Sequence, residues 1–177
     1  MLIVCNHRSL LDPFILAALS DGHISYLFNS EMPSMVPFMI NILNIYTNSL
    51  VVNKKNNVKS INEHVKKRNK GDPLLCIFAD SLGKIEENKN IAEFKTGAFV
   101  NKFKILPIII KYKNNKIDNT FDTKCTNPVE KFLELFFGEN GDIIMDIMNI
   151  VECKKEWSIN QYKDYVYDLM NKKYSIL

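Results

Sequence analysis

Residues 6–14, Asn-His-Arg-Ser-Leu-Leu-Asp-Pro-Phe, contain the side chains best suited to proton transfer. His7 carries an imidazole that titrates near neutral pH, so it can take a proton from a substrate hydroxyl. Asp12 follows closely, and a turn would bring its carboxylate to the imidazole, where it would fix the tautomer and stabilise the imidazolium. The spacing therefore predicts a general base with an orienting carboxylate.

The same residues also allow structural interpretations. Asp12 before Pro13 is typical of an N-cap followed by proline at the first helical position. Ser9 and Asp12 have the spacing of a capping box. A lone histidine in a turn is more often a polar surface residue than a base, so these alternatives stay open from these residues alone.

The elements around the motif decide where it lies. Residues 2–5 form an apolar run that predicts a strand, and a helix is expected from Pro13. His7 and Asp12 should therefore lie at the carboxyl end of a strand, where open α/β sheets bind ligands. Further β-branched, apolar runs predict strands at Ile24–Phe28, Leu50–Val52, Leu74–Phe78, Ile105–Tyr112 and Ile143–Val151.

Segments of helical periodicity alternate with these strands. Capping boxes are expected at Asn127 with Glu130 and at Ser158 with Gln161. The alternation predicts one α/β domain over residues 1–177, with a mostly parallel central sheet flanked by helices. The predicted helices are Pro13–Leu19, Pro33–Leu43, Val58–Asn69, Phe94–Phe103, Pro128–Phe137 and Ile159–Lys173.

Composition and charge exclude several classes of protein. A chain of 177 residues with 46% hydrophobic and 24% charged residues is typical of a folded domain rather than a disordered one. The net charge of +3 does not favour polyanion binding, and we expect the basic run 64–70 to be the solvated end of a helix rather than a nucleic-acid site. No run approaches the roughly 20 apolar residues of a membrane-spanning helix, and the first residues lack the features of a signal peptide.

The four cysteines are scattered, without a CxxC pair, and Cys5 and Cys76 lie inside apolar runs. This pattern is typical of reduced, buried thiols. It favours a cytosol-facing protein without structural disulfides and without a zinc or other metal site.

Several motifs, in order along the chain, resemble those of the glycerolipid acyltransferase superfamily, which includes the 1-acylglycerol-3-phosphate and lysophospholipid acyltransferases. Asn6-His7 followed by Asp12 is similar to the first motif of that family. The layout is closest to lysophosphatidylcholine acyltransferase-like members. The later motifs correspond to Leu50–Lys55, Ile77–Gly83, Phe94–Phe99 and Ile105–Ile108.

The resemblance implies a glycerol-phosphate acyltransferase-like fold and acyl transfer from acyl-CoA to a lysophospholipid or glycerol-phosphate hydroxyl. Acyl-CoA would be a co-substrate, with no other cofactor. His7 would be the general base, Asp12 its partner, and Lys54 the contact for the acceptor phosphate. The resemblance also implies a membrane-associated protein on the cytosolic face, while the charge pattern argues against a nucleic-acid partner. Substrate-binding roles are implied for Asn6, Ser9, Lys54, Asp80, Ser81, Lys84, Lys95 and Gly97.

The third motif departs from the family pattern, because Ala79, Asp80 and Ser81 replace its Pro, Glu and Gly. The shorter side chain of Asp80 moves the carboxylate by about one methylene, which can lower a rate substantially. A catalytically inactive relative that binds lipid or acyl-CoA is therefore an alternative, and a thioesterase-like hydrolase is a third. Many relatives carry a hydrophobic anchor before the first motif, so we expect the chain to be either a minimal member of the family or a fragment of a longer protein.

Overall fold

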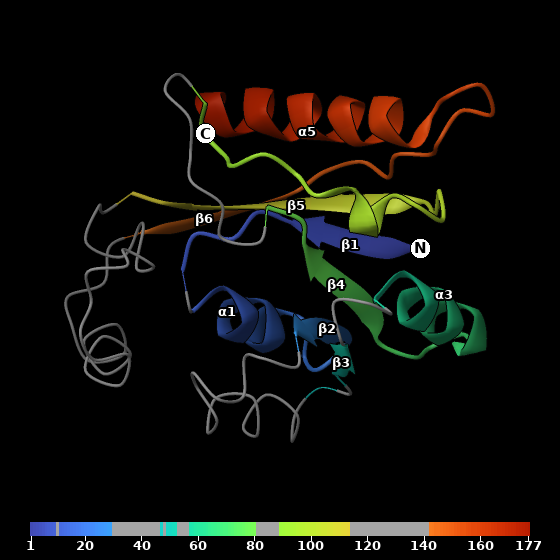
Figure 1. The fold of residues 1–177 in the computed structure, drawn as a ribbon. Helices are drawn as coiled ribbons and strands as arrows, with labels where there is room; N and C mark the ends of the chain where they lie inside the picture. Colours follow the sequence, from blue (N-terminus) through green and yellow to red (C-terminus); the bar gives the residue numbers. More distant parts are fainter. Residues whose placement is uncertain (10, 30–46, 48, 53–56, 81–88, 114–141) are drawn as a thin grey trace.

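The computed structural model describes residues 1–9, 11–29, 47, 49–52, 57–80, 89–113 and 142–177. Six described strands form one sheet in the order β3-β2-β4-β1-β5-β6 (Figure 1). All neighbouring strands are parallel except β5 and β6, so the predicted mostly parallel α/β fold is confirmed. The strands are β1 (Leu2–Cys5), β2 (Ile24–Asn29), β3 (Leu50–Val52), β4 (Leu74–Phe78), β5 (Ile105–Tyr112) and β6 (Ile143–Ile147).

Strand β1 lies inside the sheet between β4 and β5, and all four of its residues are buried. Its sequence is an uninterrupted apolar run because both of its faces are covered. Cys5 is in register with Phe78 of β4 and Ile108 of β5, and β5 continues to Tyr112. Since these strands are parallel, the residues that follow β1 and β4 meet at one edge of the sheet, beside the end of β5.

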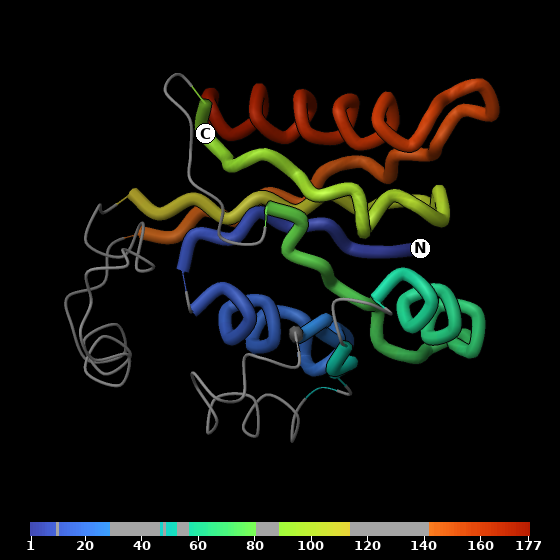
Figure 2. Tube along the Cα trace, in the orientation of Figure 1, coloured from blue at the N-terminus to red at the C-terminus, as the bar shows by residue number. Residues whose placement is uncertain are grey.

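Three described helices, α1 (Asp12–Leu19), α3 (Asn57–Lys67) and α5 (Ile159–Ile176), cover the sheet. Leu16 of α1 packs with one face, and α5 packs on the other through residues such as Val166. Ile61 of α3 belongs to the same core as α5. Figure 2 follows the chain out of β1, through a short loop and into α1, on the face opposite α5.

Helix α5 begins where the sequence predicts. Ser158 Oγ accepts a hydrogen bond from the Gln161 amide at 3.2 Å, and Gln161 Oε1 accepts one from the Ser158 amide at 2.8 Å. The predicted capping box is therefore confirmed, and it satisfies two amides that a helix start leaves unpaired.

One predicted helix does not form, and one predicted strand is shorter than expected. Instead of a helix over Phe94–Phe103, the chain makes a single 3-10 turn, η2 (Thr96–Ala98), and Lys102 has a φ of 49°. The apolar spacing there comes from tight turns that direct Phe94 and Phe99 toward α5, rather than from a helical face. The last strand ends at Ile147, and Val151 makes only an isolated bridge to Ile105.

Other predicted features lie outside the described residues. These are the helices Pro33–Leu43 and Pro128–Phe137 and the capping box at Asn127. Within the described chain, Cys5 and Cys76 are free and buried, as predicted, and Cys153 is free. No helix among the described residues is long and apolar enough to cross a membrane.

Candidate active site

Asn6 fixes the point at which the chain leaves β1. Its side-chain amide donates to the Ile110 carbonyl at 2.9 Å, and its side-chain oxygen accepts from the Ile110 amide at 2.8 Å. The side chain is fully buried and extends the pairing of β1 with β5 by one step beyond the last residue of β1. The next residue, His7, therefore starts from a rigid position at the sheet edge. A contact between Asn6 and substrate stays a prediction.

His7 and Asp12 are brought together as the sequence predicts. His7 Nδ1 lies 2.8 Å from Asp12 Oδ2, and the His7 side chain is 9% exposed while that of Asp12 is fully buried. A carboxylate can only accept, so this contact assigns the proton to Nδ1 and leaves the lone pair on Nε2. That is the tautomer a general base needs.

The carboxylate of Asp12 has three hydrogen-bond donors in addition to His7. Its Oδ2 also accepts from the backbone amides of Arg8 at 2.7 Å and Ser9 at 2.9 Å, while Oδ1 accepts from the Tyr112 hydroxyl. Together with His7 Nδ1, these donors use both carboxylate oxygens of Asp12 and fix the position of the group. Asp12 can therefore orient His7 and stabilise the imidazolium while keeping its own position.

These contacts also decide between the structural alternatives. Helix α1 begins at Asp12 itself, and its N-cap, Leu11, makes no side-chain capping bond. The carboxylate turns back toward the loop, so the N-cap interpretation of Asp12 is wrong. Only half of the capping box forms, namely the hydrogen bond from the Ser9 amide to the Asp12 carboxylate. The other half is absent because Ser9 Oγ accepts from the Leu11 amide at 3.2 Å, while the Asp12 amide donates to the Ser9 backbone carbonyl. Ser9 is fully buried in this turn, and a contact with substrate stays a prediction.

Tyr112 was not singled out from the sequence, yet its hydroxyl completes the shell of Asp12. Burial, and then the charge of Asp12, raise the pKa of Tyr112 well above its ordinary value, so the hydroxyl stays a donor. A signal was present in the sequence. Tyr112 ends the predicted strand Ile105–Tyr112, and the end of a strand adjacent to β1 lies beside the residues that follow β1.

A second contact that sequence reasoning missed is the ring of Phe78, the last residue of β4. It stacks on the His7 imidazole with ring centroids 4.2 Å apart and an interplanar angle of 23°. The stack fixes the plane of the imidazole, while the Asp12 contact fixes its rotation within that plane. Together they restrict the direction in which Nε2 points.

Asp80, from the altered third motif, reaches His7 from β4. Its Oδ2 accepts from the His7 backbone amide at 2.9 Å, and the residue is 1% exposed. Burial raises the pKa of Asp80 to about 6, although the hydrogen bond from His7 opposes this change. The structure therefore brings the first and third motifs together, with Asp80 in contact with the backbone of the candidate base.

The remaining predicted residues fall into two groups. Lys95 is exposed, and its backbone amide donates to the Ala79 carbonyl at 2.8 Å. Gly97 lies in η2 beside α3, where a Cβ would meet Asn57 at an ordinary 3.7 Å. Lys54, Ser81 and Lys84 lie outside the described residues. Among the described residues, no group of three or more His, Cys, Asp or Glu side chains is arranged to hold a metal ion.

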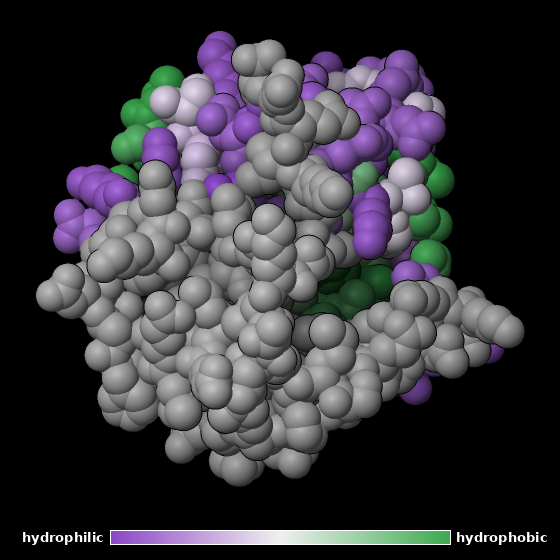
Figure 3. All heavy atoms as spheres, turned by 60° about the vertical axis from the view of Figure 1, so that its left-hand side comes forward, coloured by the Kyte–Doolittle hydropathy of each residue, from purple (hydrophilic) through white to green (hydrophobic). Residues whose placement is uncertain are grey.

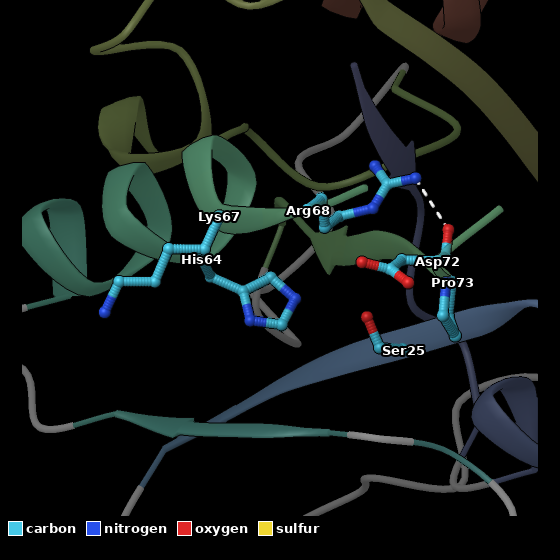
Figure 4. A pocket seen from close by; sticks show the side chains of 6 residues that line it. All are labelled: Ser25, His64, Lys67, Arg68, Asp72 and Pro73. Carbon is cyan, nitrogen blue, oxygen red and sulfur yellow. Dashed lines mark hydrogen bonds between the residues drawn. The ribbon is translucent and has the colours of Figure 1, made fainter. Parts of the chain in front are cut away.

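A pocket of about 260 Å³ lies at the opposite edge of the sheet, where the parallel strands begin (Figure 4). It contains His64 and Lys67 from the last turn of α3, where cations complement the helix dipole. The basic run 64–70 is thus a helix end, as predicted. The lining residues are Ser25, His64, Lys67, Arg68, Asp72 and Pro73, so the pocket contains none of the candidate catalytic residues.

The sequence and the fold were compared with those of known proteins. A family model described as acyltransferase matches residues 1–111, more than half of the chain, from β1 to β5. The fold is similar to the crystal structure of the 1-acyl-sn-glycerophosphate (LPA) acyltransferase PlsC from Thermotoga maritima, with a TM-score of 0.60 and 17% sequence identity. That match covers 100% of this chain and 66% of PlsC, so the chain spans somewhat less than two thirds of it. Comparison with curated proteins gives no significant match.

Proposed function

The chain belongs to the acyltransferase family, and from this we propose that it transfers an acyl group from acyl-CoA to the hydroxyl of a lysophospholipid or glycerol-phosphate acceptor. The observation that carries the proposal is the 2.8 Å contact of His7 Nδ1 with the buried Asp12 carboxylate, at the carboxyl end of β1. One similar solved structure is that of a 1-acyl-sn-glycerophosphate acyltransferase, and this supports a glycerolipid acceptor.

The proposed reaction needs one base and no covalent intermediate on the protein. His7 Nε2 takes the proton of the acceptor hydroxyl as its oxygen attacks the thioester carbonyl. The new ester C–O bond forms, the C–S bond breaks, and the imidazolium returns the proton to the departing CoA thiolate. Asp12 stabilises the imidazolium between these steps, because its carboxylate is already fixed at Nδ1 before the reaction starts.

Recognition of the acceptor phosphate is assigned to Lys54 in this proposal. An ammonium group can bind a phosphate as a point charge, although it lacks the paired donors of an arginine. Lys54→Ala is then expected to raise the KM for a phosphate-bearing acceptor with little change in kcat. Lys84 and Lys95 are the alternatives if that KM does not change.

We also propose that the protein works at a membrane surface on the cytosolic side, because lysophospholipid acceptors reside in bilayers. Figure 3 views the molecule from the side on which the parallel strands end, and some apolar side chains of the described residues are visible there. Apolar side chains suit contact with an acyl chain better than contact with a polar metabolite. Sedimentation with phospholipid vesicles, with and without added lysophospholipid, would measure the association.

One assay separates the proposed function from its alternatives. Free thiol released from an acyl-CoA is measured with and without lysophosphatidic acid. The proposed transferase releases thiol only when the acceptor is present, and a phospholipid appears in equal amount. A thioesterase releases thiol without acceptor, and an inactive binding protein releases none, although calorimetry would still detect acyl-CoA or the lysolipid.

A further inference from the structure

A second buried carboxyl group lies next to the candidate base and has no role in the mechanism above. Asp80 follows β4 by two residues, and its Oδ2 accepts from the His7 backbone amide at 2.9 Å. Asp12 holds the imidazole of His7 while Asp80 holds its backbone. The two carboxylates thus fix the same residue through different atoms.

Simple structural anchoring does not explain why this acceptor carries a charge. Oδ1 of Asp80 is buried and has no hydrogen-bond partner among the described residues. A buried carboxylate with an unpaired oxygen is costly, and a neutral acceptor could take the same amide hydrogen bond at lower cost. The ionisable groups facing Asp80 in the described structure are His7 and Asp12 on the loop after β1 and the Cys5 thiol on β1.

Among these groups, only His7 can attract the charge of Asp80. Asp12 repels it, and burial raises the pKa of Cys5 so far that the thiol stays neutral. The attraction exists only while His7 is an imidazolium, which is the state that forms as a base takes a proton. A charge that interacts favourably only in this state would lower the barrier rather than strengthen substrate binding.

We propose that Asp80 is a positioning residue, which anchors the His7 backbone and whose negative charge stabilises the imidazolium during proton transfer. This inference rests on the proposed function of His7. It differs from the role in substrate binding that the sequence resemblance implies. A substrate-binding Asp80 would act on KM, whereas a positioning Asp80 acts on kcat.

The test uses Asp80→Asn, which keeps an oxygen for the His7 amide and removes the charge. We expect kcat for acyl transfer to fall about tenfold at pH 8, with both KM values unchanged. The native-to-variant ratio of kcat should shrink toward one below about pH 6, where Asp80 itself becomes neutral.

The matched control is Asp72→Asn. Asp72 Oδ2 also accepts a backbone amide, that of Asn69 at 2.7 Å, but it lies at the opposite edge of the sheet. This variant should keep the native kcat at every pH. A kcat ratio for Asp80→Asn that does not vary with pH, or an increase confined to KM, would overturn the stabilising role of the charge.

Hydrogen exchange of the His7 amide, followed by NMR, tests the anchor independently of activity. Protection should be lost in Asp80→Ala and kept in Asp80→Asn, because only the latter retains an acceptor. If the native protein catalyses no transfer but shows this pattern, the proposed function fails and the anchor stands, without a catalytic use for the charge. If the native protein is active and His7 exchange is indifferent to Asp80→Ala, the anchor is wrong and the general base is unaffected.

Discussion

The two edges of the sheet contain the same four types of residue, connected in different ways. We call the edge at which the parallel strands end the carboxyl edge, and the edge at which they begin the amino edge. The carboxyl edge has a histidine and an aspartate in direct contact, together with a serine and an arginine on the same loop. The amino edge places the same types around the pocket of Figure 4. The first set is His7, Arg8, Ser9 and Asp12, and the second is Ser25, His64, Arg68 and Asp72.

The difference lies in what surrounds each histidine. His7 Nδ1 contacts Asp12 at 2.8 Å, whereas no hydrogen bond joins His64 to Asp72 within the described structure. Burial, and then the charge of Arg68, lower the pKa of His64, and the opposing influence of Asp72 is weaker. The surroundings of His64 therefore disfavour its protonated form, and no carboxylate of the described structure is hydrogen-bonded to it.

This contrast shows that residue types alone do not make a catalytic site. At the carboxyl edge, strand ends and backbone amides converge on one carboxylate, and that carboxylate then fixes the imidazole. At the amino edge, Asp72 caps its own turn, and its carbonyl binds Arg68. The geometry of the loop after β1 separates a candidate base from a surface histidine.

The largest expected effect follows from removing the base. His7→Ala should lower acyl transfer by roughly 10²–10⁴-fold, the usual contribution of a general base. His64→Ala, the same change at the amino edge, should leave the rate unchanged. Steady-state thiol release in the presence of acceptor measures both. Activity of His7→Ala within about tenfold of native would remove the distinction between the two edges.

Asp12→Asn is expected to lower kcat by roughly 10²-fold or more, because the amide no longer fixes the Nδ1–H tautomer. It should also lower the free energy of unfolding by about 1–3 kcal/mol, since an amide cannot accept from all the donors that surround this buried group. Urea unfolding monitored by circular dichroism gives the second quantity. A variant of native stability and native rate would show that the hydrogen bonds to Asp12 contribute nothing.

Asp80→Asn should raise stability at neutral pH, opposite in sign to the effect at Asp12. The pKa of Asp80 rises from 3.8 to about 6 on folding, so above pH 6 ionised Asp80 destabilises the protein by an amount on the order of 3 kcal/mol. Between pH 4 and 6 the folded state binds more protons than the unfolded state, so native stability falls as pH rises. The gain from the variant should grow over this window and stay constant above it. Thermal unfolding at pH 4 and pH 8 measures this gain in stability. An equal gain at the two pH values would show that it does not come from removing the charge of Asp80.

Tyr112→Phe removes one of the four donors to Asp12 and should lower kcat about tenfold or less, with a stability loss near 1 kcal/mol. Tyr162→Phe is the matched control. Its hydroxyl is a buried donor to the Phe103 and Val151 carbonyls, in the core under α5. The control should lose similar stability and keep the native kcat. Equal kcat in both variants would show that the hydroxyl of Tyr112 does not help to orient His7 through Asp12.

The sequence correctly predicted that the six described strands exist and that His7 pairs with Asp12, because both depend on local information. Apolar runs such as Leu2–Cys5 specify buried strands, and the short spacing of the pair permits contact within one loop. The alternation of strands and helices also places the motif, since α/β topologies direct the loops that follow parallel strands to one edge of the sheet.

The contacts that the sequence did not predict are long-range. Tyr112 reaches Asp12 across 100 residues, and Asp80 reaches His7 across 73. Both depend on the order β4-β1-β5, which no local pattern determines. The failed helix at Phe94–Phe103 has a similar cause, because its aromatic residues are spaced for contact with α5 rather than for helical periodicity.

The smallest effect is expected at the amino edge, from His64→Gln. The pKa of His64 is lower in the folded protein than its ordinary value of 6.5, so below pH 6.5 the unfolded state binds more protons than the folded state. The native protein should therefore lose stability through His64 as pH falls below 6.5, and His64→Gln should not. Solvent screens this partly exposed group, so we expect only a small difference in Tm that grows from pH 7 to pH 5.

His23→Gln, on the exposed turn before β2, corrects for the loss of a surface imidazole. A Tm difference independent of pH would mean that burial and Arg68 do not act on His64. The contrast between the two histidines would then rest on the Asp12 contact alone.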